Sequence, residues 1–79
     1  MIKKSGEIYL EKLAAILKTR DIFIIIEGHT DNVPISTIQF PSNWHLSAVR
    51  ASAVCAIFNK NGIPAKRLKA VGFGQSRPL

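Results

Sequence analysis

The sequence predicts an α/β fold, an α+β sandwich whose elements follow the order helix, strand, helix, strand. Two observations lead to this prediction. Apolar residues recur at helical spacing in two segments, 7–18 and 43–60, and each segment is followed by a short apolar run, at 22–26 and 70–73. A strand, a crossover helix and a second strand imply a right-handed parallel βαβ unit, which places helices and sheet in separate layers.

The composition is that of one small globular domain over residues 1–79. Apolar residues make up 47% of the chain and charged residues 20%, which is a globular rather than a disordered balance. The longest apolar runs, 22–26 and 53–58, are far below the ~20 residues that a membrane-spanning helix needs. The basic N-terminus leads into an amphipathic segment instead of an apolar signal core, so we expect neither a membrane span nor a signal peptide.

The net charge of +6, from eleven Lys and Arg against five Asp and Glu, favours an anionic partner such as nucleic acid, acidic lipid or a cell-wall polymer. Most cations are scattered, and several lie at predicted helix ends, where they complement the helix dipole. Only the run Lys66, Arg67, Leu68, Lys69 is a tight cluster, which we interpret as solvated surface. The single Cys55 excludes an internal disulfide and is interpreted as a small apolar helix residue.

The first helix and the first strand are each predicted from the spacing of apolar residues. In the segment 7–18 an apolar stripe has helical spacing, as in a helix with one buried face. Its members are Leu10, Leu13, Ala14 and Leu17, with Ile16 widening it. The run 22–26 is short, β-branched and apolar at every position. This pattern is typical of a central strand buried on both faces.

The second helix is predicted over 43–60, with Ser42 as its N-cap and Asn61-Gly62 as its C-terminal stop. Its expected buried stripe consists of Leu46, Val49, Ala53, Val54, Ile57 and Phe58. A short strand follows at 70–73, interrupted by Gly72. Because two strands are fewer than an independent sheet usually needs, we expect a truncated domain. Its open strand edges favour pairing with another chain, and a homodimer is one such assembly.

A candidate binding site is predicted where the first strand ends. Asp31 follows that strand at its carboxyl end, where open α/β sheets commonly bind ligands. Asn43, Ser47 and Arg50 are spaced by four and three, so they share one face of the second helix. Arg50 adjoins the buried stripe, where a charge needs a partner or a ligand. Asp31 could accept from an ammonium group and Arg50 could bind a carboxylate, which suits a zwitterion. A plain Asp31–Arg50 salt bridge between loop and helix is the alternative.

Other groupings of reactive residues are weaker, and we predict no metal, no cofactor and no catalytic residues. Glu27, His29 and Asp31 alternate as metal ligands can, but polar alternation at a strand end more often reflects exposure to solvent. Ser47, His29 and Asp31 supply the residue types of a hydrolase triad without the G-x-S-x-G elbow. A small hydrolase therefore lacks a complete nucleophilic site.

Two segments, 27–35 and 40–51, resemble the OmpA-like peptidoglycan-binding domain, and within it the MotB type of flagellar stators. The family pattern N-x-x-L-S-x-x-R-A-x-x-V falls on Asn43, Leu46, Ser47, Arg50, Ala51 and Val54. The resemblance implies a helix–strand–helix–strand core without the first and last strands of the family. Two departures are His45 in place of the usual Glu, which weakens a capping box with Ser42, and Phe58 in place of a Leu.

The resemblance also implies a noncatalytic anchor to the cell wall. Asp31 would bind the ammonium group and Arg50 the carboxylate of the diaminopimelate in the peptidoglycan stem peptide. The pocket around them would be shaped by Thr30, Asn43, Leu46 and Ser47. The implied location is the periplasm or the cell-wall-facing side of the inner membrane. A stator channel partner is implied only for a full-length parent with an upstream membrane helix. Nucleic acid is not an expected partner, although a basic nucleic-acid-binding fragment is the alternative function.

Overall fold

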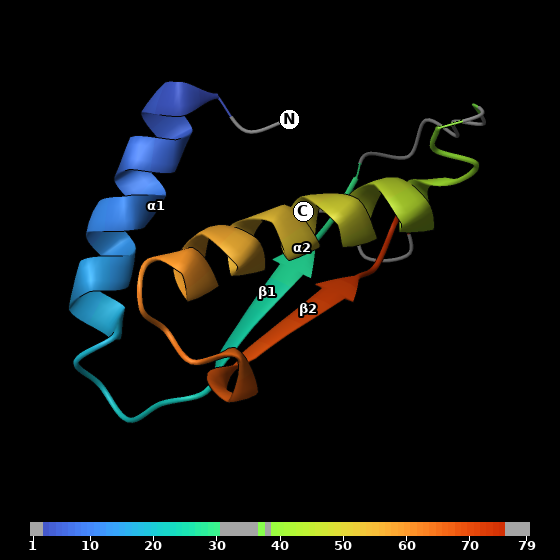
Figure 1. Ribbon diagram of the computed structural model, residues 1–79. Helices are drawn as coiled ribbons and strands as arrows, with labels where there is room; N and C mark the ends of the chain where they lie inside the picture. The colour runs from blue at the N-terminus through green and yellow to red at the C-terminus, as the bar shows by residue number, and fades with distance from the viewer. Residues whose placement is uncertain (1–2, 31–36, 38, 76–79) are drawn as a thin grey trace.

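The computed structural model describes residues 3–30, 37 and 39–75. Its elements are α1 (Lys4–Leu17), β1 (Ile24–Gly28), α2 (Asn43–Lys60), the short 3₁₀ helix η1 (Ala65–Arg67) and β2 (Leu68–Gly72). The two strands pair in parallel, in a register that runs from Ile24 opposite Leu68 to Gly28 opposite Gly72. The predicted order of elements and the βαβ crossover are therefore confirmed (Figure 1).

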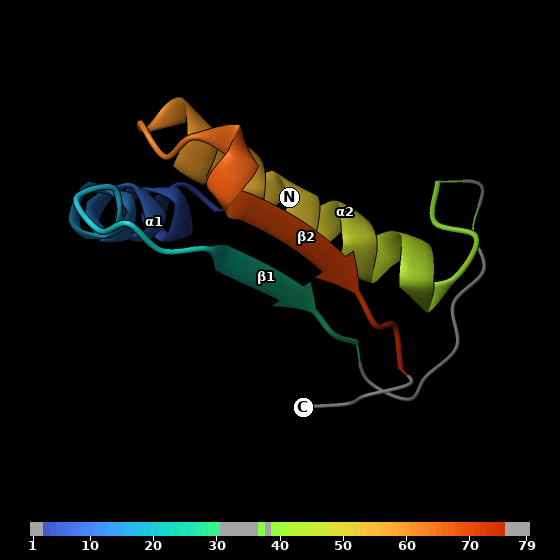
Figure 2. The ribbon, with the colours of Figure 1, turned by 90° about the horizontal axis from the view of Figure 1, so that it is seen from below.

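Both helices lie on one side of the two strands (Figure 2). The core between the layers is centred on three buried side chains, Ala14 of α1, Phe58 of α2 and Ile63. Partly buried residues from α1, α2 and both strands pack around them: Leu10, Leu13, Leu17, Ile24, Ile26, Val54 and Leu68. The predicted stripe of α1 thus faces this core, although α1 begins at Lys4, three residues before the predicted start.

The prediction that the first strand is buried on both faces is wrong. Side chains of β1 alternate between half-buried and exposed, and Ile25 keeps an exposed fraction of 57%. Phe23, just before the strand, is 83% exposed. Because both helices cover the same face of the sheet, no described element covers the opposite face. The apolar residues at alternate positions therefore face away from the core.

The position of Arg67 explains why β1 begins later than the apolar run. Its Nε donates to the Ile22 carbonyl oxygen at 2.7 Å, and its Nη2 donates to the Leu17 carbonyl oxygen at 3.1 Å. The Ile22 carbonyl is thus bonded to a side chain instead of to a neighbouring strand. The interpretation of the run 66–69 as plain solvated surface is wrong for Arg67, which joins η1 to the end of α1.

The limits of α2 agree with the prediction. Ser42 has the extended backbone of an N-cap and accepts a hydrogen bond from the His45 backbone N–H at 3.4 Å. The His45 ring also bonds Ser42, because its Nδ1 lies 2.8 Å from the Ser42 Oγ. Histidine thus contacts the cap hydroxyl, whereas a capping-box Glu would reach the cap backbone N–H. Gly62 ends the helix region with a φ of 106°, a conformation that favours glycine.

The buried face of α2 is rotated from the predicted stripe. Its buried residues are Asn43, Ser47, Ala51 and Phe58, whereas Val49 is 42% exposed. Small and polar residues therefore occupy the face that touches the strand ends, and the large apolar side chains gather toward the C-terminal half of the helix. Among the described helices, none combines the length and apolar character needed to cross a membrane.

Candidate ligand-binding site

Two glycines bring the backbone of α2 onto the carboxyl ends of both strands. Gly28 and Gly72 are register partners and end β1 and β2. A Cβ atom on Gly28 would overlap the carbonyl oxygen of Ser47, and one on Gly72 would lie 2.6 Å from the backbone nitrogen of Ala48. Helix and sheet can approach this closely only because neither position carries a side chain.

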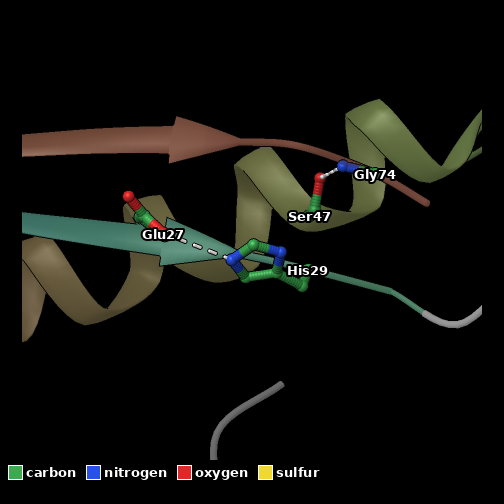
Figure 3. Close-up of polar contacts among 4 residues, drawn as sticks. All are labelled: Glu27, His29, Ser47 and Gly74. Atoms are coloured by element: carbon green, nitrogen blue, oxygen red, sulfur yellow. Dashed lines mark hydrogen bonds and ion pairs between the residues drawn. The ribbon is translucent and has the colours of Figure 1, made fainter. Parts of the chain in front are cut away.

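Ser47 links the helix to the segment after β2. Its side chain is completely buried, and its hydroxyl donates to the Trp44 carbonyl oxygen at 3.1 Å. The same Oγ accepts the backbone N–H of Gly74 at 2.9 Å (Figure 3). The carbonyl oxygen of Gly74 in turn accepts the backbone N–H of Thr30 at 2.9 Å. We call this chain of two hydrogen bonds, from Thr30 through Gly74 to Ser47, the tether.

Asn43 makes a second link at the start of α2. Its exposed fraction is 3%, and its Nδ2 donates to the Gln75 Oε1 at 3.0 Å. Asn43 and Ser47, predicted to share a helix face, thus both lie on the buried face and both bond the segment 74–75. Thr30 is also buried, so the end of β1, the start of α2 and the segment after β2 meet at one edge of the molecule.

Of the two charged residues of the predicted site, the structure describes only Arg50. Asp31 lies outside the described residues, so its pairing with Arg50 across one cavity stays a prediction. Arg50 is exposed on α2, and no carboxylate in the described ranges forms an ion pair with it. Solvent therefore hydrates the Arg50 guanidinium. The expectation that burial makes this charge need a partner is wrong. Leu46 is half-buried.

Glu27 and His29 lie on one face of β1 and its extension, as their alternation predicts. The His29 Nε2 is 3.4 Å from the Glu27 Oε1 (Figure 3). The His29 ring stacks on Phe73, with ring centroids 5.3 Å apart and planes 18° from parallel. The hydrogen bonding between β1 and β2 continues by one bond past the strand ends, because the Phe73 N–H donates to the Gly28 carbonyl oxygen at 2.9 Å. Within the described ranges, no three His, Cys, Asp or Glu residues gather as a metal site would require.

Cys55 lies on α2, half-buried. Burial raises the pKa of its thiol, which lowers the fraction of reactive thiolate at neutral pH. This agrees with its interpretation as an apolar helix residue.

The family model of the OmpA family matches residues 1–79. The chain belongs to the OmpA family. It is 44% identical over 79 residues to the uncharacterized protein YtxE of Bacillus subtilis, covering 99% of this chain and 33% of that protein. It is 46% identical over 57 residues to motility protein B of the same species, covering 71% of this chain and 22% of that protein. The chain thus spans about a fifth to a third of the length of these relatives.

Solved structures share the fold across the chain. The C-terminal domain of Helicobacter pylori MotB has a TM-score of 0.88 at 26% identity, covering 100% of this chain and 60% of that one. The cell wall anchor of the type VI secretion system from Pseudomonas aeruginosa has a TM-score of 0.86 at 31% identity, covering 98% and 54%. The predicted MotB-type OmpA-like fold is confirmed by these likenesses.

Proposed function

We propose that this chain is a noncatalytic peptidoglycan-binding module that anchors a larger envelope protein to the cell wall. The observation that carries the proposal is the match of the whole chain to the OmpA family. The likeness to a cell wall anchor at 31% identity supports it. A net charge of +6 suits a wall polymer that carries carboxylates.

The proposed ligand is the diaminopimelate of the stem peptide, held at both of its charged ends. Arg50 binds the carboxylate, for which its exposed guanidinium offers two parallel N–H donors. Asp31 binds the ammonium group. Thr30, Asn43, Leu46 and Ser47 shape the pocket around them. Support comes from Thr30, the residue before Asp31, because it is bonded through Gly74 to the helix that carries Arg50.

In this proposal the module works on the wall-facing side of the inner membrane, in the periplasm, with residues 1–79 acting as one domain. A channel-forming partner belongs to a larger parent protein of the stator kind. Self-pairing of the chain through its strand edges is a further proposed assembly.

Binding to a diaminopimelate-containing muropeptide tests the proposal. We expect Asp31→Ala and Arg50→Ala each to weaken binding by at least about tenfold, because each removes a charge-assisted hydrogen bond. Both variants should also lose retention on sedimented peptidoglycan, and their circular dichroism should match that of the unmodified chain.

The chain offers matched controls at two neighbouring exposed positions, Arg20→Ala and Asp21→Ala, which make the same charge changes away from the carboxyl ends of the strands. These controls should bind normally. Wild-type affinity in both Asp31→Ala and Arg50→Ala would refute the proposed ligand site. Muropeptide that is bound but never cleaved separates an anchor from a hydrolase.

Nucleic-acid binding is the competing function, and the contacts of Arg67 count against it. Arg67 is the middle cation of the run 66–69, the only tight basic cluster in the sequence, and its guanidinium donates two hydrogen bonds to backbone carbonyls. Duplex binding would weaken steeply with salt, because it depends on neutralising phosphates. We expect no shift of duplex DNA in a gel assay at low salt.

A further inference from the structure

We propose that Ser47 is a positioning residue, whose hydroxyl acts through Gly74 to hold Thr30 at a fixed distance from α2. This proposal rests on the binding function above and assigns Ser47 a role within it. The side chain sets the geometry of the site without touching the ligand.

Burial and hydrogen bonds inside the protein keep the Ser47 side chain from contacting a ligand. Its exposed fraction is 0%, its single O–H donates to the Trp44 carbonyl oxygen, and its Oγ accepts the Gly74 N–H. A hydroxyl has one donor, and here both the donor and one acceptor position are used inside the protein. The bond to Gly74 joins residues 27 positions apart, so it fixes tertiary rather than local structure.

The tether joins the two elements that carry the proposed charged groups. At one end, Thr30 directly precedes Asp31, and consecutive Cα atoms are ~3.8 Å apart. At the other end, Ser47 and Arg50 are three residues apart on one helix, a rise of ~4.5 Å. The charges of a zwitterion have a fixed separation, so a site that binds both ends needs its own two groups at a matching distance. Gly28 already lies against the Ser47 backbone at the end of β1, and the tether extends this fixed spacing to Thr30, beside Asp31.

The backbone conformation of Gly74 lets it form both hydrogen bonds of the tether. Its φ is +61°, in the left-handed region, and a Cβ there would lie 3.1 Å from the backbone nitrogen of Trp44. In this conformation its N–H bonds Ser47 while its carbonyl bonds Thr30. The glycine lets the chain after β2 pass close to the start of α2 and bond both neighbours.

Amide hydrogen exchange on Ser47→Ala tests the tether directly. We expect the amides of Gly74 and Thr30 to exchange about tenfold faster, because the Gly74 N–H loses its acceptor and the segment it anchors is released. The amide of Ile26, inside β1, should keep its rate. Muropeptide affinity should fall by about tenfold.

Two controls on the same helix separate positioning from general loss of stability. Ser52→Ala makes the same substitution at an exposed position and should change neither exchange nor affinity. Ala56→Gly, also exposed, destabilises α2 through helix propensity alone. It should speed exchange evenly across the helix and strands while leaving the affinity of the folded chain unchanged.

The result that would overturn the proposal is a wild-type exchange rate at Thr30 in Ser47→Ala. An even rise that includes Ile26 would overturn it as well, since a merely structural serine predicts that result. Ser47→Cys, which keeps a weak sulfur acceptor, should give an intermediate rate at Thr30, and it decides the question if Ser47→Ala does not fold. Failure of the unmodified chain to bind muropeptide would remove the proposed function, whereas the exchange rates would still decide the tether.

Discussion

Arg67 shows how one side chain can join three parts of a small fold. Its guanidinium lies between the carbonyl oxygens of Leu17, at the end of α1, and Ile22, before β1, while its own backbone belongs to η1. The positive charge also suits the C-terminal end of α1, where the helix dipole is negative. A planar group with several fixed N–H directions can serve both acceptors at once.

We therefore expect Arg67→Ala to lower the free energy of unfolding by about 1.5–3 kcal/mol, the range for hydrogen bonds to charged groups. Arg67→Lys should recover only part of this loss, because an ammonium on a flexible stem cannot hold both carbonyls in one geometry. Urea denaturation followed by circular dichroism measures the change. Lys66→Ala, at the exposed neighbour, is the control. Equal midpoints for Arg67→Ala and Lys66→Ala would contradict this role.

Among the elements, the paired glycines at the strand ends decide how α2 lies on the sheet. A methyl group on Gly72 would meet the nitrogen, Cα and Cβ of Ala48 at 2.6–2.9 Å, so α2 or β2 must shift to admit it. Substitutions that overpack a close contact typically cost about 1–3 kcal/mol.

Gly72→Ala is therefore expected to lower the midpoint of thermal unfolding and to weaken muropeptide binding, because it displaces the helix that carries Arg50. Gly6→Ala in α1 provides a matched control. There alanine replaces glycine in a helix, which should stabilise the chain by about 0.5–1 kcal/mol. If both variants unfold at the same temperature, the proposed close packing is wrong.

The element with the clearest local signals was also the most predictable. The limits of α2 follow from Ser42 and from Asn61-Gly62, which act on the backbone nearby. The start of β1 could not be placed because it depends on Arg67, 45 residues from Ile22. The exposure of Ile25 depends on which face the helices cover, and an all-apolar run contains no signal for this choice.

In the candidate site, too, the local features were predictable and the contacts with distant segments were not. Helical spacing correctly put Asn43 and Ser47 on one face of α2, and the family pattern singled out both. Their bonds to Gly74 and Gln75 were missed, because those partners come from a distant segment. The available signal was a glycine at the end of each strand, Gly28 and Gly72, and only Gly72 was interpreted, as an interruption of its strand.

For the molecule as a whole, stability depends on one small core. A chain of this size buries only about 60% of the surface that it exposes when unfolded, which leaves little reserve. Phe58, with an exposed fraction of 2%, lies where α1, α2 and both strands meet. Its aromatic ring fills the centre of that cluster.

Phe58→Ala should therefore cost about 3–5 kcal/mol, the range for a buried aromatic, and leave much of the chain unfolded at 37 °C. Phe58→Leu should fold with a smaller loss. Phe23→Ala removes the same ring from a position that is 83% exposed and should melt as the unmodified chain does. Thermal melts of the three variants rank these costs, and similar melting of Phe58→Ala and Phe23→Ala would refute this account of the core.

The glycine contact has a consequence for the shape of the space between the layers. At Gly28 and Gly72 the helix backbone touches the sheet, while at the opposite ends of the strands Phe58, Ile24 and Leu68 hold the layers apart. The interlayer space is therefore a wedge, narrow and polar at the carboxyl ends of the strands, wide and apolar at their amino ends. Because the two glycines hold α2 against the sheet at one end, a bulkier residue between the layers at the other end would tilt the helix. The tilt would change the orientation of Arg50 although no residue near Arg50 is substituted.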